Sequence, residues 1–183
     1  MDFDRLVDDY EKPIYNLIYR LVGDSEEAAD LTQETFVSAY RSYSEFRGES
    51  SAYTWLYRIA LNKCKNKFKE RDRCRKFETL SLDNGFGTDD GQIGGEVASW
   101  EYSPHIAIER KELKEHIARA MSELPYDYRI VAVLRDIEGL SYQDIADAAD
   151  LSVDVVRTRL ARARAMLRKK LGAYLDAGNS SSA

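Results

Sequence analysis

The sequence predicts an all-α protein made of two small helical domains that are joined by a flexible acidic linker. Apolar residues recur every three or four positions over long stretches, and strict alternation is scarce. Five of the ten glycines fall between positions 77 and 104, among acidic and small residues. We therefore predict a first domain over 1–76, the linker over 77–104, a second domain over 105–175 and a disordered tail over 176–183.

Three helices are expected in the first domain. The first has apolar positions at Leu6, Tyr10, Ile14, Leu17 and Leu21, and Pro13 either starts a new helix there or kinks this one. Gly23 ends it, and Asp24 with Glu27 three residues later forms the capping signal of the next helix. The apolar stripe of this second helix is read as Ala28, Leu31, Phe36, Ala39 and Tyr40, and a third helix covers 53–76.

The second domain contains the pattern of a helix-turn-helix in "SYQDIADAADLSVDVVRTRLARAR". Ser141 and Asp144 form a capping signature, and Asp150 occupies the turn, where a left-handed backbone is needed. Ser152 caps the following helix, whose inner stripe is Val153, Val156, Leu160, Ala163 and Leu167. Its outer face presents Asp154, Arg157, Thr158 and Arg162, residue types that read base edges in a major groove or contact phosphates. A solvated basic face on a terminal helix is the plainer alternative.

Positive charge is concentrated in two blocks, although the net charge is -5. Residues 56–76 contain nine Lys/Arg against two Asp/Glu, and residues 157–183 contain seven against one. Local patches decide nucleic-acid binding, so the acidic pI of about 5.2 does not argue against it. In the first block the stripe Trp55, Ile59, Asn62 and Asn66 adjoins Arg58, Lys65 and Lys69, a combination suited to unpaired bases. Core packing is the simpler account of Leu56, Tyr57 and Ile59.

Several classes of protein are disfavoured by the sequence. The acidic start "MDFDRLVDDYEK" is unlike a signal peptide, and no apolar run is long enough to span a membrane, so a cytoplasmic protein is expected. Cys64 and Cys74 would lie roughly 15 Å apart on one helix, beyond the reach of a disulfide. Packed or surface positions explain these cysteines and the two histidines better than a zinc site, because no tight CxxC pair is present. We find no catalytic triad or phosphate loop, and expect neither enzymatic activity nor a cofactor.

The quoted motifs resemble one family closely. "DLTQETFVSAYRSYSEFRGESSAYTWLYRIALNKCKN", an acidic linker and the helix-turn-helix occur in the order found in extracytoplasmic-function (group 4) sigma factors of bacterial RNA polymerase. The resemblance covers nearly the whole chain. It implies binding to the β′ clamp helices and the β flap of core polymerase, recognition of promoter DNA, and control by an anti-sigma factor.

The resemblance also implies three sets of site residues. Core polymerase is expected to bind Asp30, Gln33, Glu34 and Phe36. The melted minus-ten element, with one base flipped into a pocket, is expected at Phe46, Tyr53, Trp55, Arg58, Asn62, Lys65 and Asn66. The minus-thirty-five duplex is expected at Asp154, Arg157, Thr158, Arg159 and Arg162.

Two other functions are compatible with parts of the sequence. A stand-alone helix-turn-helix regulator would use the second domain, but the linker and the three-helix first domain are not explained by it. A mimic that sequesters another factor would need the acidic surfaces but not the arginine-rich helix. The sequence does not decide how the two domains are arranged in the free protein.

Overall fold

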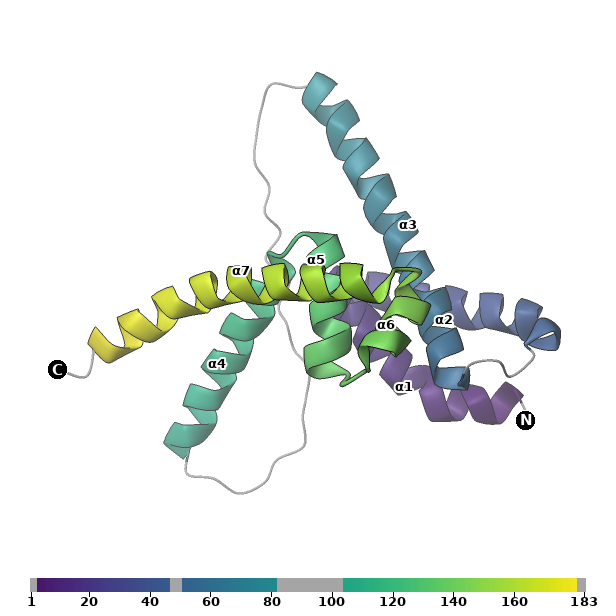
Figure 1. The fold of residues 1–183 in the computed structure, drawn as a ribbon, viewed down its shortest axis with the longest axis horizontal. Helices are drawn as coiled ribbons and strands as arrows, with labels where there is room; N and C mark the ends of the chain where they lie inside the picture. The colour runs from purple at the N-terminus through teal and green to yellow at the C-terminus, as the bar shows by residue number, and fades with distance from the viewer. Residues whose placement is uncertain (1–2, 47–50, 82–103, 181–183) are drawn as a thin grey trace.

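The computed structural model describes residues 3–46, 51–81 and 104–180, and within these ranges the chain is helical with no β-strand. The all-α prediction is therefore confirmed. In chain order the elements are α1 (Phe3–Val22), α2 (Ser25–Ser42), a 3-10 turn η1 (Tyr43–Glu45), α3 (Ala52–Ser81), α4 (Pro104–Ser122), α5 (Tyr126–Ala132), a π turn η2 (Val133–Ile137), α6 (Tyr142–Ala149) and α7 (Val153–Ser180) (Figure 1).

The first domain is built from α1, α2 and α3, and the predicted helix boundaries between them are confirmed. Gly23 ends α1 with a positive φ of 81°, a conformation that glycine adopts without steric cost. The carboxylate of Asp24 accepts a hydrogen bond of 2.7 Å from the backbone N–H of Glu27 and so caps α2. Pro13 lies inside α1, which runs past it as one helix.

One predicted core residue of α2 is placed wrongly by the sequence pattern. Ala28, Leu31, Phe36 and Ala39 are buried as expected, but Tyr40 is 67% exposed and packs edge-to-face with Phe3, at a centroid distance of 5.1 Å. Neighbouring positions on a helix point about 100° apart. With Ala39 directed inward, Tyr40 is rotated out of the buried stripe.

The helix-turn-helix of the second domain follows the sequence signals. The Ser141 hydroxyl accepts from the N–H of Asp144, and the Asp144 carboxylate accepts from the N–H of Ser141, which completes a capping box before α6. Asp150 adopts the left-handed conformation with φ 55°, as the turn requires. Val156, Leu160 and Ala163 are buried along the inner stripe of α7, and Val153 and Leu167 are partly buried.

Two helices extend beyond the predicted domain limits. Helix α3 continues to Ser81, five residues past the predicted limit at 76. Helix α7 continues to Ser180, so helix replaces most of the tail that was expected to be disordered from 176. The added segments contain no proline, and glycine alone weakens a helix without necessarily ending it. Trp100, the large apolar residue of the predicted linker, lies outside the described residues.

The two domains pack against each other. Helix α6 contacts α3, and α4, α5 and η2 contact α1 (Figure 1). Buried side chains of both domains, from Leu6 to Ala163, belong to one hydrophobic cluster. This closed arrangement determines which of the predicted site residues face solvent and which face the other domain.

Candidate functional site

The outer face of α2 is a mixed polar and apolar surface. Asp30, Gln33 and Glu34 are exposed there, as the predicted polymerase contacts would be, whereas Phe36 is only 9% exposed and belongs to the core. Two exposed apolar residues of the same face, Val37 at 50% and Tyr40 at 67% exposure, were not among the predicted site residues. We call Asp30, Gln33, Glu34, Val37 and Tyr40 the α2 outer stripe. Their spacing of three and four residues is the sequence signal that places them on one face of the helix.

The aromatic end of α3 lies at the edge of the first-domain core. Trp55 is 8% exposed, and its ring lies 4.8 Å from that of Phe46 and 6.5 Å from that of Tyr43, measured between centroids. Tyr53 is partly buried and donates a hydrogen bond of 2.7 Å to the hydroxyl of Tyr57. The structure thus brings Phe46 and Trp55 together, with Trp55 held by packing.

Farther along α3, the remaining predicted minus-ten residues are exposed. Arg58, Asn62, Lys65 and Asn66 occupy positions separated by three or four residues, so they share one face of the helix. The structure therefore separates the predicted set into a packed aromatic end and a solvent-facing polar and cationic stretch.

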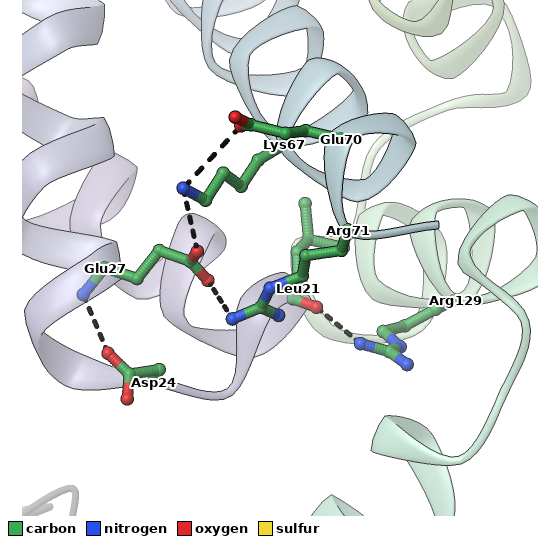
Figure 2. A network of polar contacts seen from close by, with 7 residues as sticks. All are labelled: Leu21, Asp24, Glu27, Lys67, Glu70, Arg71 and Arg129. Atoms are coloured by element: carbon green, nitrogen blue, oxygen red, sulfur yellow. Dashed lines mark hydrogen bonds and ion pairs between the residues drawn. The ribbon is translucent and has the colours of Figure 1, made fainter. Parts of the chain in front are cut away.

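The basic block of α3 divides into two faces. One face pairs with α2, where Lys63 contacts Glu34 at 3.2 Å. On the same side, Lys67 and Arg71 contact Glu27 at 3.7 and 2.7 Å (Figure 2). Glu27 lies in the first turn of α2, where the helix dipole favours a carboxylate. No local sequence signal indicates this pairing, which accounts for part of the positive charge of the block.

The predicted recognition helix α7 presents most of its chosen residues to solvent. Asp154, Arg157, Thr158 and Arg162 are exposed. Arg159 is partly buried, and its guanidinium lies 3.2 Å from the Asp127 carboxylate on α5. Asp154 lies 3.7 Å from Arg157, and its carbonyl oxygen accepts a hydrogen bond from the Thr158 hydroxyl.

In the closed arrangement the exposed face of α3 and the outer face of α7 border a common cleft of about 770 Å³. Lys65 and Lys69 line it from α3, and Thr158, Arg159 and Arg162 line it from α7. Cations from both basic blocks therefore line this cleft, and Asp72, Asp127 and Asp154 add negative charge to the lining.

Two groups on the α5–η2 side of the second domain reach into the first. The Glu138 carboxylate accepts a hydrogen bond of 2.8 Å from the Tyr57 hydroxyl and pairs with Arg20 of α1. The Arg129 guanidinium donates to the carbonyl oxygen of Leu21 at 2.5 Å (Figure 2). Burial, and then the hydrogen bond with Tyr53, raise the pKa of Tyr57, while burial lowers the pKa of Arg129. Tyr57 therefore remains a neutral donor to Glu138.

The two cysteines are expected to differ strongly in reactivity. Burial raises the pKa of Cys64 to about 12, whereas Cys74 is exposed. At pH 8 a thiol of that pKa is ionised in roughly one molecule in ten thousand, against about a quarter for an ordinary cysteine of pKa about 8.5. Titration of the folded protein with an aromatic disulfide reagent should modify one thiol rapidly. Rapid modification of both without denaturant would contradict the burial of Cys64.

The described residues offer neither a metal site nor a membrane span. No cluster of three or more histidine, cysteine or acidic side chains able to hold a metal ion occurs among them. None of the helices in the described ranges combines the length and apolar character needed to cross a bilayer.

Comparison with known proteins identifies the family. Residues 6–74 match the family described as Sigma-70 region 2, and residues 114–167 match Sigma-70, region 4. The RNA polymerase sigma-H factor of Pseudomonas aeruginosa is 40% identical over 171 residues, which cover 92% of this chain and 86% of that protein. The ECF RNA polymerase sigma-E factor of Haemophilus influenzae is 37% identical over 169 residues, with coverage of 92% and 87%. The chain belongs to the ECF sigma factors.

Solved sigma factors share the fold. The sigma factor RpoE of Bartonella quintana, crystallised with the anti-sigma factor NepR, has a TM-score of 0.68 at 22% identity, over 93% of this chain and 97% of that one. CnrH, in complex with the cytosolic domain of CnrY, has a TM-score of 0.63 at 23% identity, with coverage of 93% and 88%. The family membership supports a sigma factor and not the stand-alone regulator.

Proposed function

We propose that this sigma factor directs core RNA polymerase to promoters through three separate surfaces. The α2 outer stripe binds the β′ clamp helices, and the second domain binds the β flap. The exposed face of α3 takes the melted minus-ten strand, and the outer face of α7 reads the minus-thirty-five duplex. The chain catalyses no reaction itself. It acts in the cytoplasm, where an anti-sigma factor restrains it.

The observation that carries this proposal is the separation of charge and exposure among the three surfaces. Arg58, Asn62 and Lys65 on α3 and Arg162 on α7 are exposed in two different domains, while the polymerase stripe on α2 is acidic and apolar. A protein that reads two promoter elements needs two cationic surfaces. A third, non-cationic surface suits a protein partner, because exposed apolar residues at its centre supply binding energy.

The burial of Trp55 refines the minus-ten assignment. Its ring is enclosed by packing, so we propose that Trp55 supports the base pocket and that Tyr53, Arg58, Asn62, Lys65 and Asn66 contact the strand. Flipping a base costs a few kcal/mol of unstacking, which contacts in the pocket must offset. Phe36, buried in the core, is proposed to position the α2 outer stripe in the same indirect way.

The proposal is tested with purified components. The full chain and core polymerase are mixed and separated by size-exclusion chromatography, and the complex is then tested for promoter opening by permanganate reactivity of unpaired thymines. Co-elution together with opening is expected. A folded chain that does not bind core polymerase would contradict the proposed function.

Arg162→Ala tests the reading of the upstream element. Arg162 is exposed, so little change in folding stability is expected, but one bidentate contact to guanine contributes about 1–3 kcal/mol of discrimination. We expect the variant holoenzyme to lose that amount on the cognate promoter and less on a promoter with a scrambled upstream element. Equal losses on both would restrict Arg162 to a phosphate contact, and no loss would remove it from the interface.

A further inference from the structure

We propose that Tyr142 and Asp154 are positioning residues that hold the Arg157 guanidinium in the orientation needed to read a guanine of the minus-thirty-five duplex. This inference rests on the proposed function, which places α7 in a major groove. It adds which arginine reads a base, which base it reads, and which side chains make that reading possible. The contacts that carry it lie within the second domain, at the start of α6 and in the first turns of α7.

Arg157 lies in the N-terminal part of α7. It is the fifth residue of the helix, which begins at Val153. The N-terminal residues of a recognition helix are those that meet base edges in the major groove. The Arg157 side chain is 63% exposed, so its donors are accessible to a duplex. An exposed arginine samples many rotamers and loses this freedom on binding. Contacts that orient it beforehand reduce that entropic cost.

The ring of Tyr142 provides one orienting contact. The guanidinium carbon of Arg157 lies over this ring, 6.0 Å from its centroid. Arg135 lies over the same ring at 5.1 Å and donates a hydrogen bond of 2.6 Å to the carbonyl oxygen of Leu140. The ring is partly buried against the core, and Tyr142 is the first residue of α6, directly after the capping box of Ser141. The first turn of α6 therefore supports Arg157.

The ring contact orients Arg157 without using its hydrogen-bond donors. An aromatic ring attracts a cation through its π face, so the N–H groups stay available for a base. Two other arginines of α7 are held differently. Arg159 donates to the Asp127 carboxylate at 3.2 Å. Arg164 donates to the Asp136 carboxylate through two nitrogens. Arg157 differs from both, because it is oriented while remaining able to form two hydrogen bonds with one base.

Asp154 determines which kind of acceptor suits Arg157. Its carboxylate oxygen lies 3.7 Å from Nη1 of Arg157, close enough for an ion pair but too far for a hydrogen bond. An exposed pair of this kind adds little to the stability of the free protein. On DNA it disfavours a phosphate beside Arg157, because the phosphate would lie close to a second anion. Guanine offers O6 and N7 as neutral acceptors, and one arginine can donate to both.

The test begins with a promoter that the protein itself selects. Core polymerase loaded with the full chain selects duplexes from a library whose minus-thirty-five element is randomised. Each guanine of the selected element is then replaced singly by 7-deazaguanine, which lacks the N7 acceptor and keeps base pairing intact. Competition binding gives the loss of affinity at each position. At one guanine we expect a loss of roughly fivefold or more, which should be absent in the Arg157→Ala holoenzyme.

Tyr142→Leu separates the orientation of Arg157 from its presence. The arginine is retained and its ring contact is lost, so the analogue should reduce affinity by about twofold or less at the same guanine. Losses at any other guanine should be unchanged and provide an internal reference. Tyr142→Phe keeps the ring and should keep the full loss. Thermal unfolding followed by circular dichroism shows whether Tyr142→Leu is folded, and Asp154→Asn, at an exposed position, is the second variant.

Asp154→Asn should also reduce the loss at the guanine read by Arg157, because the uncharged side chain no longer disfavours a phosphate contact. Asp150→Asn is its matched control, since it removes the same charge at the exposed turn, and asparagine tolerates the left-handed conformation found there. A general electrostatic effect on affinity would occur in both variants, whereas only Asp154→Asn should weaken guanine discrimination.

Three results would overturn the inference. The first is a selected element at which 7-deazaguanine has no effect on the original chain. The second is a folded Tyr142→Leu holoenzyme that keeps the full loss at the guanine read by Arg157. The third is an Asp154→Asn holoenzyme that discriminates as strongly as Asp150→Asn. Failure of the proposed function shows separately, because the holoenzyme would then select no minus-thirty-five sequence at all.

Discussion

Replacement of Trp55 by alanine is expected to lower the free energy of unfolding by about 3–5 kcal/mol, the range for large aromatic residues removed from a core. Trp55 is 8% exposed and packs on Phe46 and Tyr43. Its loss leaves a cavity beneath the proposed minus-ten pocket. Promoter opening should therefore fall together with stability. Chemical denaturation followed by circular dichroism measures the change, because the described part of the chain is helical.

Trp55→Phe is the matched variant. It keeps an aromatic ring against Phe46 and removes only part of the volume, so a smaller loss of stability is expected. If Trp55→Ala were as stable as the original chain but still failed to open promoters, the side chain would act directly on DNA and the supporting role proposed here would be wrong.

Replacement of Val37 by aspartate is expected to weaken binding to core polymerase by about 2 kcal/mol or more, which is roughly 30-fold. Val37 lies at 50% exposure within the α2 outer stripe, between Glu34 and the exposed ring of Tyr40. An aspartate there would have to be desolvated against the partner. Because the position is exposed, the thermal unfolding of the free chain should change little. Titration of core polymerase with fluorescently labelled chain measures the affinity.

Lys12→Gln provides the control for net charge. It changes the total charge by the same amount at an exposed position of α1 that does not belong to the α2 outer stripe, and should leave polymerase affinity nearly unchanged. An equal loss in both variants would indicate a general electrostatic effect. Unchanged binding of Val37→Asp would exclude this face of α2 from the polymerase interface.

Local signals predicted most of the helical elements. The capping box at Ser141, the left-handed Asp150, and Gly23 before the Asp24 cap depend on interactions within a few residues, so the sequence determines them directly. The inner stripe of α7 was equally predictable from the sequence, because a periodic apolar pattern on a helix marks the face that is buried. The helix ends at Ser81 and Ser180 were not predicted, since those segments have low helix preference without a strong stop.

Contacts between distant segments could not be predicted in the same way. The sequence indicated nucleic-acid binding by the basic block of α3, yet Lys67 and Arg71 pair with Glu27, which lies about forty residues earlier in the chain. Tyr40 lies four residues after the buried Phe36 and three residues after the exposed Val37. Its spacing is therefore compatible with the inner face of α2 as well as with the outer one. Glu138 and Arg129 carried no local signal, since their partners belong to the other domain.

The Arg129 contact has a consequence for how the cell could control this chain. A guanidinium keeps its charge in proteins, and peptide carbonyls neither gain nor lose protons near neutrality, so this part of the contact does not respond to a change in acidity. Its burial also protects it from screening by dissolved salt. A fall in pH or a rise in salt concentration would therefore leave it intact. A macromolecule that competes for the same surfaces is the kind of signal to which this contact would respond.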